Sequence, residues 1–222
     1  MTIQQENLVS IPVNSIRLQG NLSIPKAAQG VVLFAHGSGS SRHSPRNRFV
    51  AEVLREGGLA TLLIDLLSEE EEAIDRQTRQ LRFDINLLAT RLAGIIDWLS
   101  QNQSTRNLPI GCFGASTGAA AALVAAAQRG HLVKAIVSRG GRPDLAASAL
   151  SHVQAPTLLI VGGNDHPVIK MNQSALAQLH SEKQLKIVPK ATHLFEEPGA
   201  LEEVARLAAE WFQSYLQLDM PP

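Results

Sequence analysis

The fold is decided by one stretch, IGCFGASTGAAAALVAAA, residues 110–127. Ile110–Phe113 is a short apolar run typical of a buried strand, and an Ala-rich run typical of a helix follows Gly118. Between them, Ser116 stands in a G-x-S-x-G pentapeptide that begins at Gly114. Glycines at both ends suit a sharp strand-to-helix turn, because Cβ atoms there would collide with neighbouring backbone. The stretch therefore predicts a serine hydroxyl presented above a sheet, beside a helix N-terminus.

Outward from this stretch, apolar runs and amphipathic segments alternate, which is typical of a parallel sheet with helices on both faces. Before residue 30, two strands with interleaved polar residues are close enough to pair as an antiparallel hairpin at one edge. No internal repeat or long linker divides the chain, so we expect one α/β domain over residues 1–222. The other predicted strands are 8–12, 14–24, 31–35, 60–64, 135–137, 157–161 and 185–188, and the other predicted helices are about 46–56, 84–100 and 200–216.

Composition excludes several classes of protein. The chain has 222 residues, is 45% hydrophobic, and balances 20 basic against 20 acidic residues. This argues against disorder, and the zero net charge gives no field that would attract nucleic acid. The longest apolar stretch, Gly118–Ala127, is well short of the roughly 20 residues that span a bilayer, so no membrane partner is expected. The single cysteine and the absence of a signal-like start predict a cytoplasmic protein.

Two further residues complement Ser116. Asp165 follows the predicted strand 157–161, and His193 follows the predicted strand 185–188. Loops at the carboxyl ends of parallel strands converge on one crevice, so we expect the three side chains to meet. Their chain order, Ser, Asp, His, is that of α/β-hydrolases. In this prediction His193 is the general base, and Asp165 holds its tautomer and stabilises the imidazolium.

The sequence HGSGS, residues 36–40, directly follows the predicted strand 31–35. In this fold the second amide of the oxyanion hole comes from that loop. We therefore predict that the backbone N–H groups of Ser38 and Thr117 bind the oxyanion. His36 is expected to shape this loop and to have no catalytic role.

With these motifs, nearly the whole chain resembles an α/β-hydrolase without a cap domain, and it is most similar to dienelactone-hydrolase-like proteins. The motifs are residues 36–39, 114–118, 163–165 with Val168, and 191–195. Dienelactone hydrolases proper use a cysteine nucleophile and a glutamate in the loop after the third strand. Here Ser116 is the nucleophile and residues 36–41 contain no acidic residue, which argues against dienelactone itself as the substrate. The resemblance implies a hydrolase for a small ester, lactone or thioester.

Two loop arginines, Arg139 and Arg142, follow the predicted strand 135–137 toward the same crevice. By resemblance to dienelactone hydrolases, one of them is expected to bind an anionic group of the substrate. No cluster of residues has metal-ligand spacing, and neither a metal nor another cofactor is predicted. Three alternatives remain open: an acyltransferase or a peptidase that uses the same triad, and a non-catalytic binding protein with the same fold.

Overall fold

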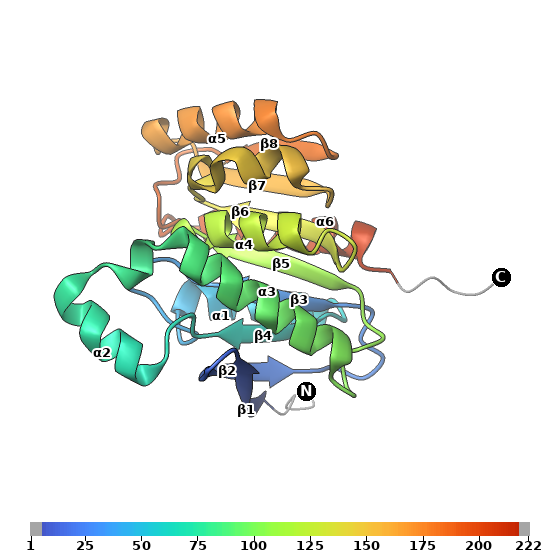
Figure 1. Cartoon of the computed structure of the whole chain (residues 1–222). Coiled ribbons are helices and arrows are strands. Elements are labelled where there is room, and N and C mark those ends of the chain that lie inside the picture. The colour runs from blue at the N-terminus through green and yellow to red at the C-terminus, as the bar shows by residue number, and fades with distance from the viewer. Residues whose placement is uncertain (1–5, 218–222) are drawn as a thin grey trace.

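The computed structural model describes residues 6–217, in which eight strands form one sheet (Figure 1). The strand order is β1-β2-β4-β3-β5-β6-β7-β8. β1 and β2 form an antiparallel hairpin, β2 also pairs antiparallel with β4, and the remaining pairs are parallel. The strands are β1 (Glu6–Val13), β2 (Ile16–Ser23), β3 (Val31–Ala35), β4 (Ala60–Ile64), β5 (Ile110–Ala115), β6 (Val133–Arg139), β7 (Thr157–Gly162) and β8 (Lys183–Val188).

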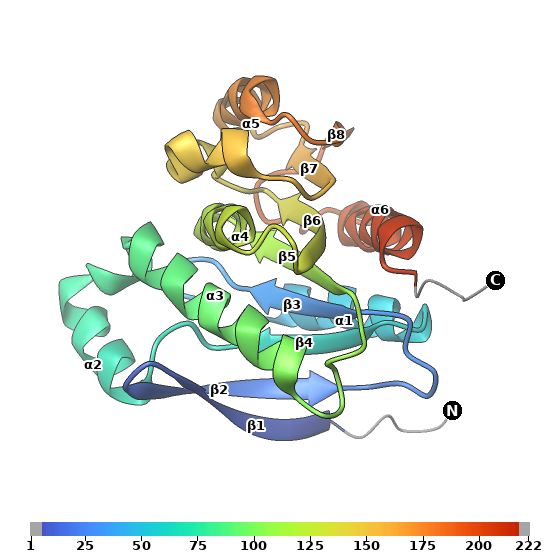
Figure 2. The same ribbon diagram turned by 45° about the vertical axis from the view of Figure 1, so that its right-hand side comes forward.

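Helices cover both faces of this sheet. α3, α4 and α5 pack on one face and α1 and α6 on the other (Figure 2). Each face has its own apolar core, because every residue of the central strands β3 and β5 is buried. The helices are α1 (Pro45–Glu56), α2 (Glu69–Thr78), α3 (Ile85–Gln101), α4 (Thr117–Gln128), α5 (His166–Gln178) and α6 (Ala200–Tyr215), with 3₁₀ segments η1 (Leu81–Phe83) and η2 (Pro143–His152).

This architecture confirms the predicted fold class: a mostly parallel sheet with an N-terminal antiparallel hairpin and helices on both faces. No separate cap domain is seen within residues 6–217. The structure adds α2, which lies beyond the carboxyl end of β4 (Figure 1). Its four glutamates, residues 69–72, form the first helical turn, where carboxylates complement the helix dipole. No helix of the described chain is long and apolar enough to cross a membrane.

The strand order places the predicted site residues along one edge of the sheet. Because β3 to β8 are parallel, the loops after these strands open at the same edge of the sheet. The residues that follow the strands along this edge are Asp65 after β4, His36 after β3, Ser116 after β5, Gly140 after β6, Asp165 after β7 and His193 after β8. The predicted nucleophile therefore lies near the middle of the edge, with the loops after β3 and β4 on one side and those after β6, β7 and β8 on the other.

Candidate active site

The turn at Ser116 has the strained backbone that its flanking glycines predict. Ser116 has φ 50° and ψ −123°, a conformation that costs a non-glycine residue about 1–3 kcal/mol. A Cβ atom on Gly114 would lie 2.4 Å from Ala119 Cα, and one on Gly118 would lie 2.4 Å from the carbonyl oxygen of Ala35. Neither position has room for a side chain. Close backbone packing therefore forces the turn and holds the serine in its strained geometry.

Hydrogen bonds fix the backbone of Ser116 on both sides. Its N–H donates to the carbonyl oxygen of Arg139 at 3.2 Å. Its own carbonyl oxygen accepts from the N–H groups of Ala119 and Arg142, each at 3.1 Å. The hydroxyl itself makes no hydrogen bond within the described chain, so it is free to meet a substrate.

His193 and Asp165 are brought together as predicted. His193 Nδ1 lies 2.7 Å from Asp165 Oδ2. An acceptor carboxylate at Nδ1 favours the tautomer with the proton there, which leaves Nε2 as the proton acceptor. The carboxylate is the more buried partner, since its side chain is 12% exposed and the imidazole is 40% exposed. Asp165 occupies the N-cap position of α5, but its side chain does not cap the helix and is available to His193.

Sequence reasoning missed the contacts that clamp the His193 loop onto the turn after β7. Asn164 donates from its backbone N–H to Ala191 at 2.9 Å and from its side-chain amide to Lys190 at 2.8 Å. A Cβ atom on Gly162 would lie 2.4 Å from the carbonyl oxygen of Ala191. The sequence signal for these contacts is the run GGN at residues 162–164, because glycine permits such a close backbone approach. The clamp sets the position from which His193 reaches Asp165.

Gly140 links the imidazole to the serine turn. It has φ +50°, and a Cβ atom on it would lie 3.5 Å from His193 Cε1. Its neighbour Arg139 supplies the carbonyl that holds Ser116. No hydrogen bond joins Ser116 Oγ to His193 in the described residues. Of the predicted triad, the structure therefore shows a direct contact between His193 and Asp165 alone.

The two predicted oxyanion donors lie on neighbouring segments, Ser38 in the loop after β3 and Thr117 in the first turn of α4. The Ser38 N–H donates to Thr117 Oγ1 at 2.9 Å, so this amide already has a partner in the free protein. His36 has the structural role expected of it: Nδ1 lies 2.9 Å from the carbonyl oxygen of Gly37, and Nε2 accepts from the Leu66 N–H at 3.2 Å. Burial lowers the pKa of His36, although Asp65 and Glu72 oppose that effect.

The structure separates the two predicted arginines. Arg142 forms a bidentate ion pair with Asp144, with distances of 2.9 and 2.8 Å, and is therefore already engaged. Arg139 is only 8% exposed, and its Nε and Nη1 have no hydrogen-bond partner. Burial, and then the nearby charge of Arg46, lower the pKa of Arg139 to about 10. Sequence reasoning missed Arg46, which lies distant in sequence and pairs with Glu196 at 3.2 Å.

Cys112 lies inside the sheet and is 2% exposed. Burial raises the pKa of its thiol to about 12, so the reactive thiolate is not formed near neutral pH. Cys112 is therefore a small buried apolar residue of β5 and not a reactive thiol.

Comparison with known proteins identifies the family. The dienelactone hydrolase family matches residues 18–218. The chain belongs to this family. A crystal structure of a dienelactone hydrolase from Anabaena variabilis ATCC 29413 is 66% identical, covers 96% of this chain and 99% of its own, and superposes with a TM-score of 0.95. Est1E from Butyrivibrio proteoclasticus shares the fold at 17% identity and a TM-score of 0.77, covering 93% of this chain and 98% of its own.

Two curated relatives carry a different name. Proteins from two strains of Mycobacterium tuberculosis, each named "Putative phosphoribosyl transferase", are 56% identical over 208 residues. The match covers 94% of this chain and 46% of those proteins. This chain therefore spans about half the length of those relatives, and their name describes a longer protein.

Proposed function

We propose that this hydrolase cleaves a small carboxylic ester, lactone or thioester through an acyl-enzyme intermediate, with Ser116, His193 and Asp165 as a catalytic triad. The proposal rests on one observation above all. The 2.7 Å contact between His193 Nδ1 and Asp165 Oδ2 lies at the same sheet edge as a serine whose backbone is strained at a strand-to-helix turn. Membership of the dienelactone hydrolase family supports it.

The reaction follows from the tautomer of His193. Ser116 Oγ attacks the substrate carbonyl carbon as His193 Nε2 accepts its proton. The imidazolium then gives that proton to the leaving oxygen or sulfur as the scissile bond breaks. In the second half, Nε2 takes a proton from water, the hydroxide attacks the acyl carbon, and Ser116 regains its proton as the acid leaves. Asp165 stabilises the imidazolium in both halves.

The oxyanion is proposed to lie between the N–H groups of Thr117 and Ser38. Thr117 begins α4, so its N–H has no acceptor within the helix and lies at the positive end of the helix dipole. The Ser38 N–H would exchange its bond to Thr117 Oγ1 for one to the oxyanion. Because the oxyanion carries charge and the hydroxyl does not, this exchange favours the transition state over the free enzyme.

For the acyl group, we propose that Arg139 binds an anionic substituent. A buried guanidinium without a partner is costly, and an anion would relieve that cost. Arg142 lacks this property because Asp144 neutralises it. The test compares a neutral ester with its carboxylate-bearing analogue in Arg139→Ala and Arg142→Ala. We expect Arg139→Ala to lose activity selectively on the anionic ester by about 10-fold or more. Equal losses on both esters would contradict this role.

The transferase name of the curated relatives applies to proteins of which this chain spans about half. Within that half, the groups along the sheet edge are a nucleophile, an imidazole and backbone donors, which suit acyl chemistry. We therefore propose ester hydrolysis for this chain, and not phosphoribosyl transfer.

The direct test is hydrolysis of p-nitrophenyl esters of increasing acyl length by the wild type, Ser116→Ala and Ser174→Ala, an exposed serine outside the site. Loss of a nucleophile typically lowers kcat by about 10³-fold or more, so we expect activity in the wild type and the control alone. Product analysis with an added alcohol or amine separates hydrolysis from acyl transfer. Equal activity in Ser116→Ala would contradict the proposal.

A further inference from the structure

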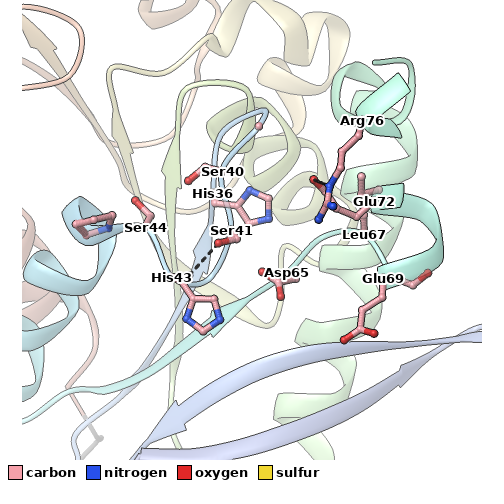
Figure 3. Close-up of a pocket in the computed structure, with 13 residues that line it drawn as sticks. His36, Ser40, Ser41, His43, Ser44, Asp65, Leu67, Glu69, Glu72 and Arg76 are labelled. Atoms are coloured by element: carbon pink, nitrogen blue, oxygen red, sulfur yellow. Dashed lines mark hydrogen bonds and ion pairs between the residues drawn. The ribbon is translucent and has the colours of Figure 1, made fainter. Parts of the chain in front are cut away.

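A cavity of about 670 Å³ opens beside the oxyanion loop, which is within the size range of ligand sites. One wall is the loop after β3, residues 39–45, and the other is α2 with the segment after β4 (Figure 3). None of the triad residues is among its lining residues. It is therefore a compartment next to the reaction centre, and the mechanism proposed above does not use it.

The cavity adjoins the nucleophile through the oxyanion loop. His36 and Gly39 line it, and these residues flank Ser38. A Cβ atom on the neighbouring Gly37 would lie 3.1 Å from Ser116 Cβ, so this loop touches the serine. The cavity is on the β3 and β4 side of Ser116, whereas Arg139 ends β6 on the opposite side. With the acyl group toward Arg139, as proposed above, the alcohol part of an ester at Ser116 would lie on the side of the cavity.

The side chains around the cavity combine hydrogen-bond donors with acceptors. Ser40, Ser41 and His43 line the loop wall, and Glu69, Glu72 and Arg76 line the α2 wall (Figure 3). Leu67 and Pro45 add apolar surface between them. Hydroxyl groups both donate and accept, so a ligand with several hydroxyls on a carbon frame satisfies such a lining.

Charge pairing argues against a simple ion as the occupant. Asp65 is bound by both the backbone N–H and the guanidinium of Arg42. Glu72 lies 3.9 Å from Arg76, so these two charges largely balance. Among the lining carboxylates only Glu69 has no ion pair within the described residues, so the excess charge is small. An alkyl group would leave the carboxylates and hydroxyls without partners.

We propose that this cavity binds the alcohol part of the substrate and that this part is hydroxyl-rich, a sugar or a polyol. The inference rests on the hydrolase activity proposed above, which supplies the bond to be cleaved. Glu72 and Ser41 act as specificity residues from opposite walls of the cavity. The ester carbon remains at Ser116, and the released product is the free sugar or polyol.

The α2 wall is anchored firmly enough to position such a ligand. Asp75 is fully buried and accepts from the Leu81 N–H at 2.7 Å and from Arg82 Nε at 2.5 Å. Glu71 accepts from Arg91 of α3 at 2.5 Å. Glu72 thus lies on a helix that ion pairs hold in place, opposite the loop that carries Ser41.

The kinetic test uses two esters that share the acyl group preferred in the p-nitrophenyl series. One carries it on O6 of glucose, and the other carries it on cyclohexylmethanol, which has a similar ring but lacks the hydroxyls. We expect kcat/KM to favour the sugar ester by about 10-fold or more, because a site built for hydroxyls discriminates against an analogue without them. Glu72→Gln and Ser41→Ala should bring this ratio toward one, whereas Glu52→Gln, an exposed residue outside the cavity, should leave it unchanged. Equal or better hydrolysis of the cyclohexylmethyl ester by the wild type would overturn the proposal.

A binding measurement separates this inference from the proposed activity. The Ser116→Ala protein is titrated with methyl β-glucoside and with cyclohexylmethanol, and amide chemical shifts are followed by NMR. We expect the glucoside alone to shift amides in residues 39–45 and 67–76, and Glu72→Gln to weaken that response. Shifts there without ester hydrolysis by the wild type would refute the proposed function and support the sugar site. Ester hydrolysis with no shifts and no preference for the sugar ester would support the proposed function and refute the sugar site.

Discussion

The turn at Ser116 and helix α2 border the same edge of the sheet but are held in different ways. The turn is fixed by backbone packing, with no room for a Cβ atom at Gly114 or Gly118. In α2 only Asp75 is buried, and ion pairs attach the helix to the rest of the chain. The first region supports the reaction, which tolerates little displacement, and the second supports the proposed substrate selectivity. Changes to α2 should therefore alter substrate choice while leaving the nucleophile intact.

The largest expected effect comes from filling the turn. Gly118→Ala would place a Cβ atom 2.4 Å from the carbonyl oxygen of Ala35, so strand or helix must move. We expect the free energy of unfolding to fall by about 3 kcal/mol or more. As a control, Gly58 has open space around its Cβ position, so Gly58→Ala should cost only the roughly 1 kcal/mol that its positive φ imposes on alanine. Urea denaturation measures both, and similar losses would show that packing does not fix the turn.

Asp75→Asn tests how α2 is attached to the rest of the chain. The buried carboxylate holds Arg82 and the Leu81 N–H, so its loss should cost about 2 kcal/mol. Because α2 packs only lightly on the rest of the chain, that cost should appear as local opening. Hydrogen exchange should accelerate at amides of residues 69–83 and remain slow in β5 and α4. Equal acceleration in all these elements would show that α2 is an integral part of the core.

The same contrast explains what the sequence could predict. The apolar runs of β3 and β4 were predicted to the residue, because a short buried run between turn signals has one simple interpretation. The glycines around Ser116 predicted the turn, because no side chain fits at either position. α2 is mostly exposed, and the stretch EEEE at residues 69–72 fits a loop as well as a helical turn. Its helical state depends on a capping box with Ser68 and on ion pairs to later residues.

Within the site, the sequence placed Asp165 and His193 on adjoining loops, because each follows a strand of the same parallel sheet. It could not distinguish Arg139 from Arg142. That distinction depends on Asp144, which neutralises one arginine, and on Arg46, which comes near the other only in the folded chain. Long-range neighbours of this kind leave no local pattern in the sequence.

Arg139 offers a smaller test, in which stability and activity change in opposite directions. Arg139→Met removes a buried charge without a partner and keeps much of the apolar stem. We expect the free energy of unfolding to rise by about 1 kcal/mol, with selective loss of activity on esters of anionic acids. Thermal unfolding and the paired esters measure the two effects. A less stable variant would show that Arg139 has a stabilising partner in the folded protein.

The smallest predicted effect concerns His36. Burial lowers the pKa of its imidazole. The folded state then binds this proton less readily than the unfolded chain, so stability is present above the ordinary histidine pKa near 6.5 and is lost as pH falls below it. Between pH 7 and 5.5 we expect the free energy of unfolding to drop by about 1 kcal/mol more in the wild type than in His36→Gln. Parallel pH profiles for the two proteins would contradict this assignment.

The central claim is that Ser116 is an activated nucleophile, and labelling with a fluorophosphonate probe tests it most directly. Intact-mass measurement followed by peptide mapping would locate the adduct in the wild type, Ser116→Ala and His193→Ala. We predict a single adduct on Ser116 in the wild type, none in Ser116→Ala, and much slower labelling in His193→Ala. An unlabelled wild type, or an adduct on another residue, would contradict the account and favour a non-catalytic member of the family.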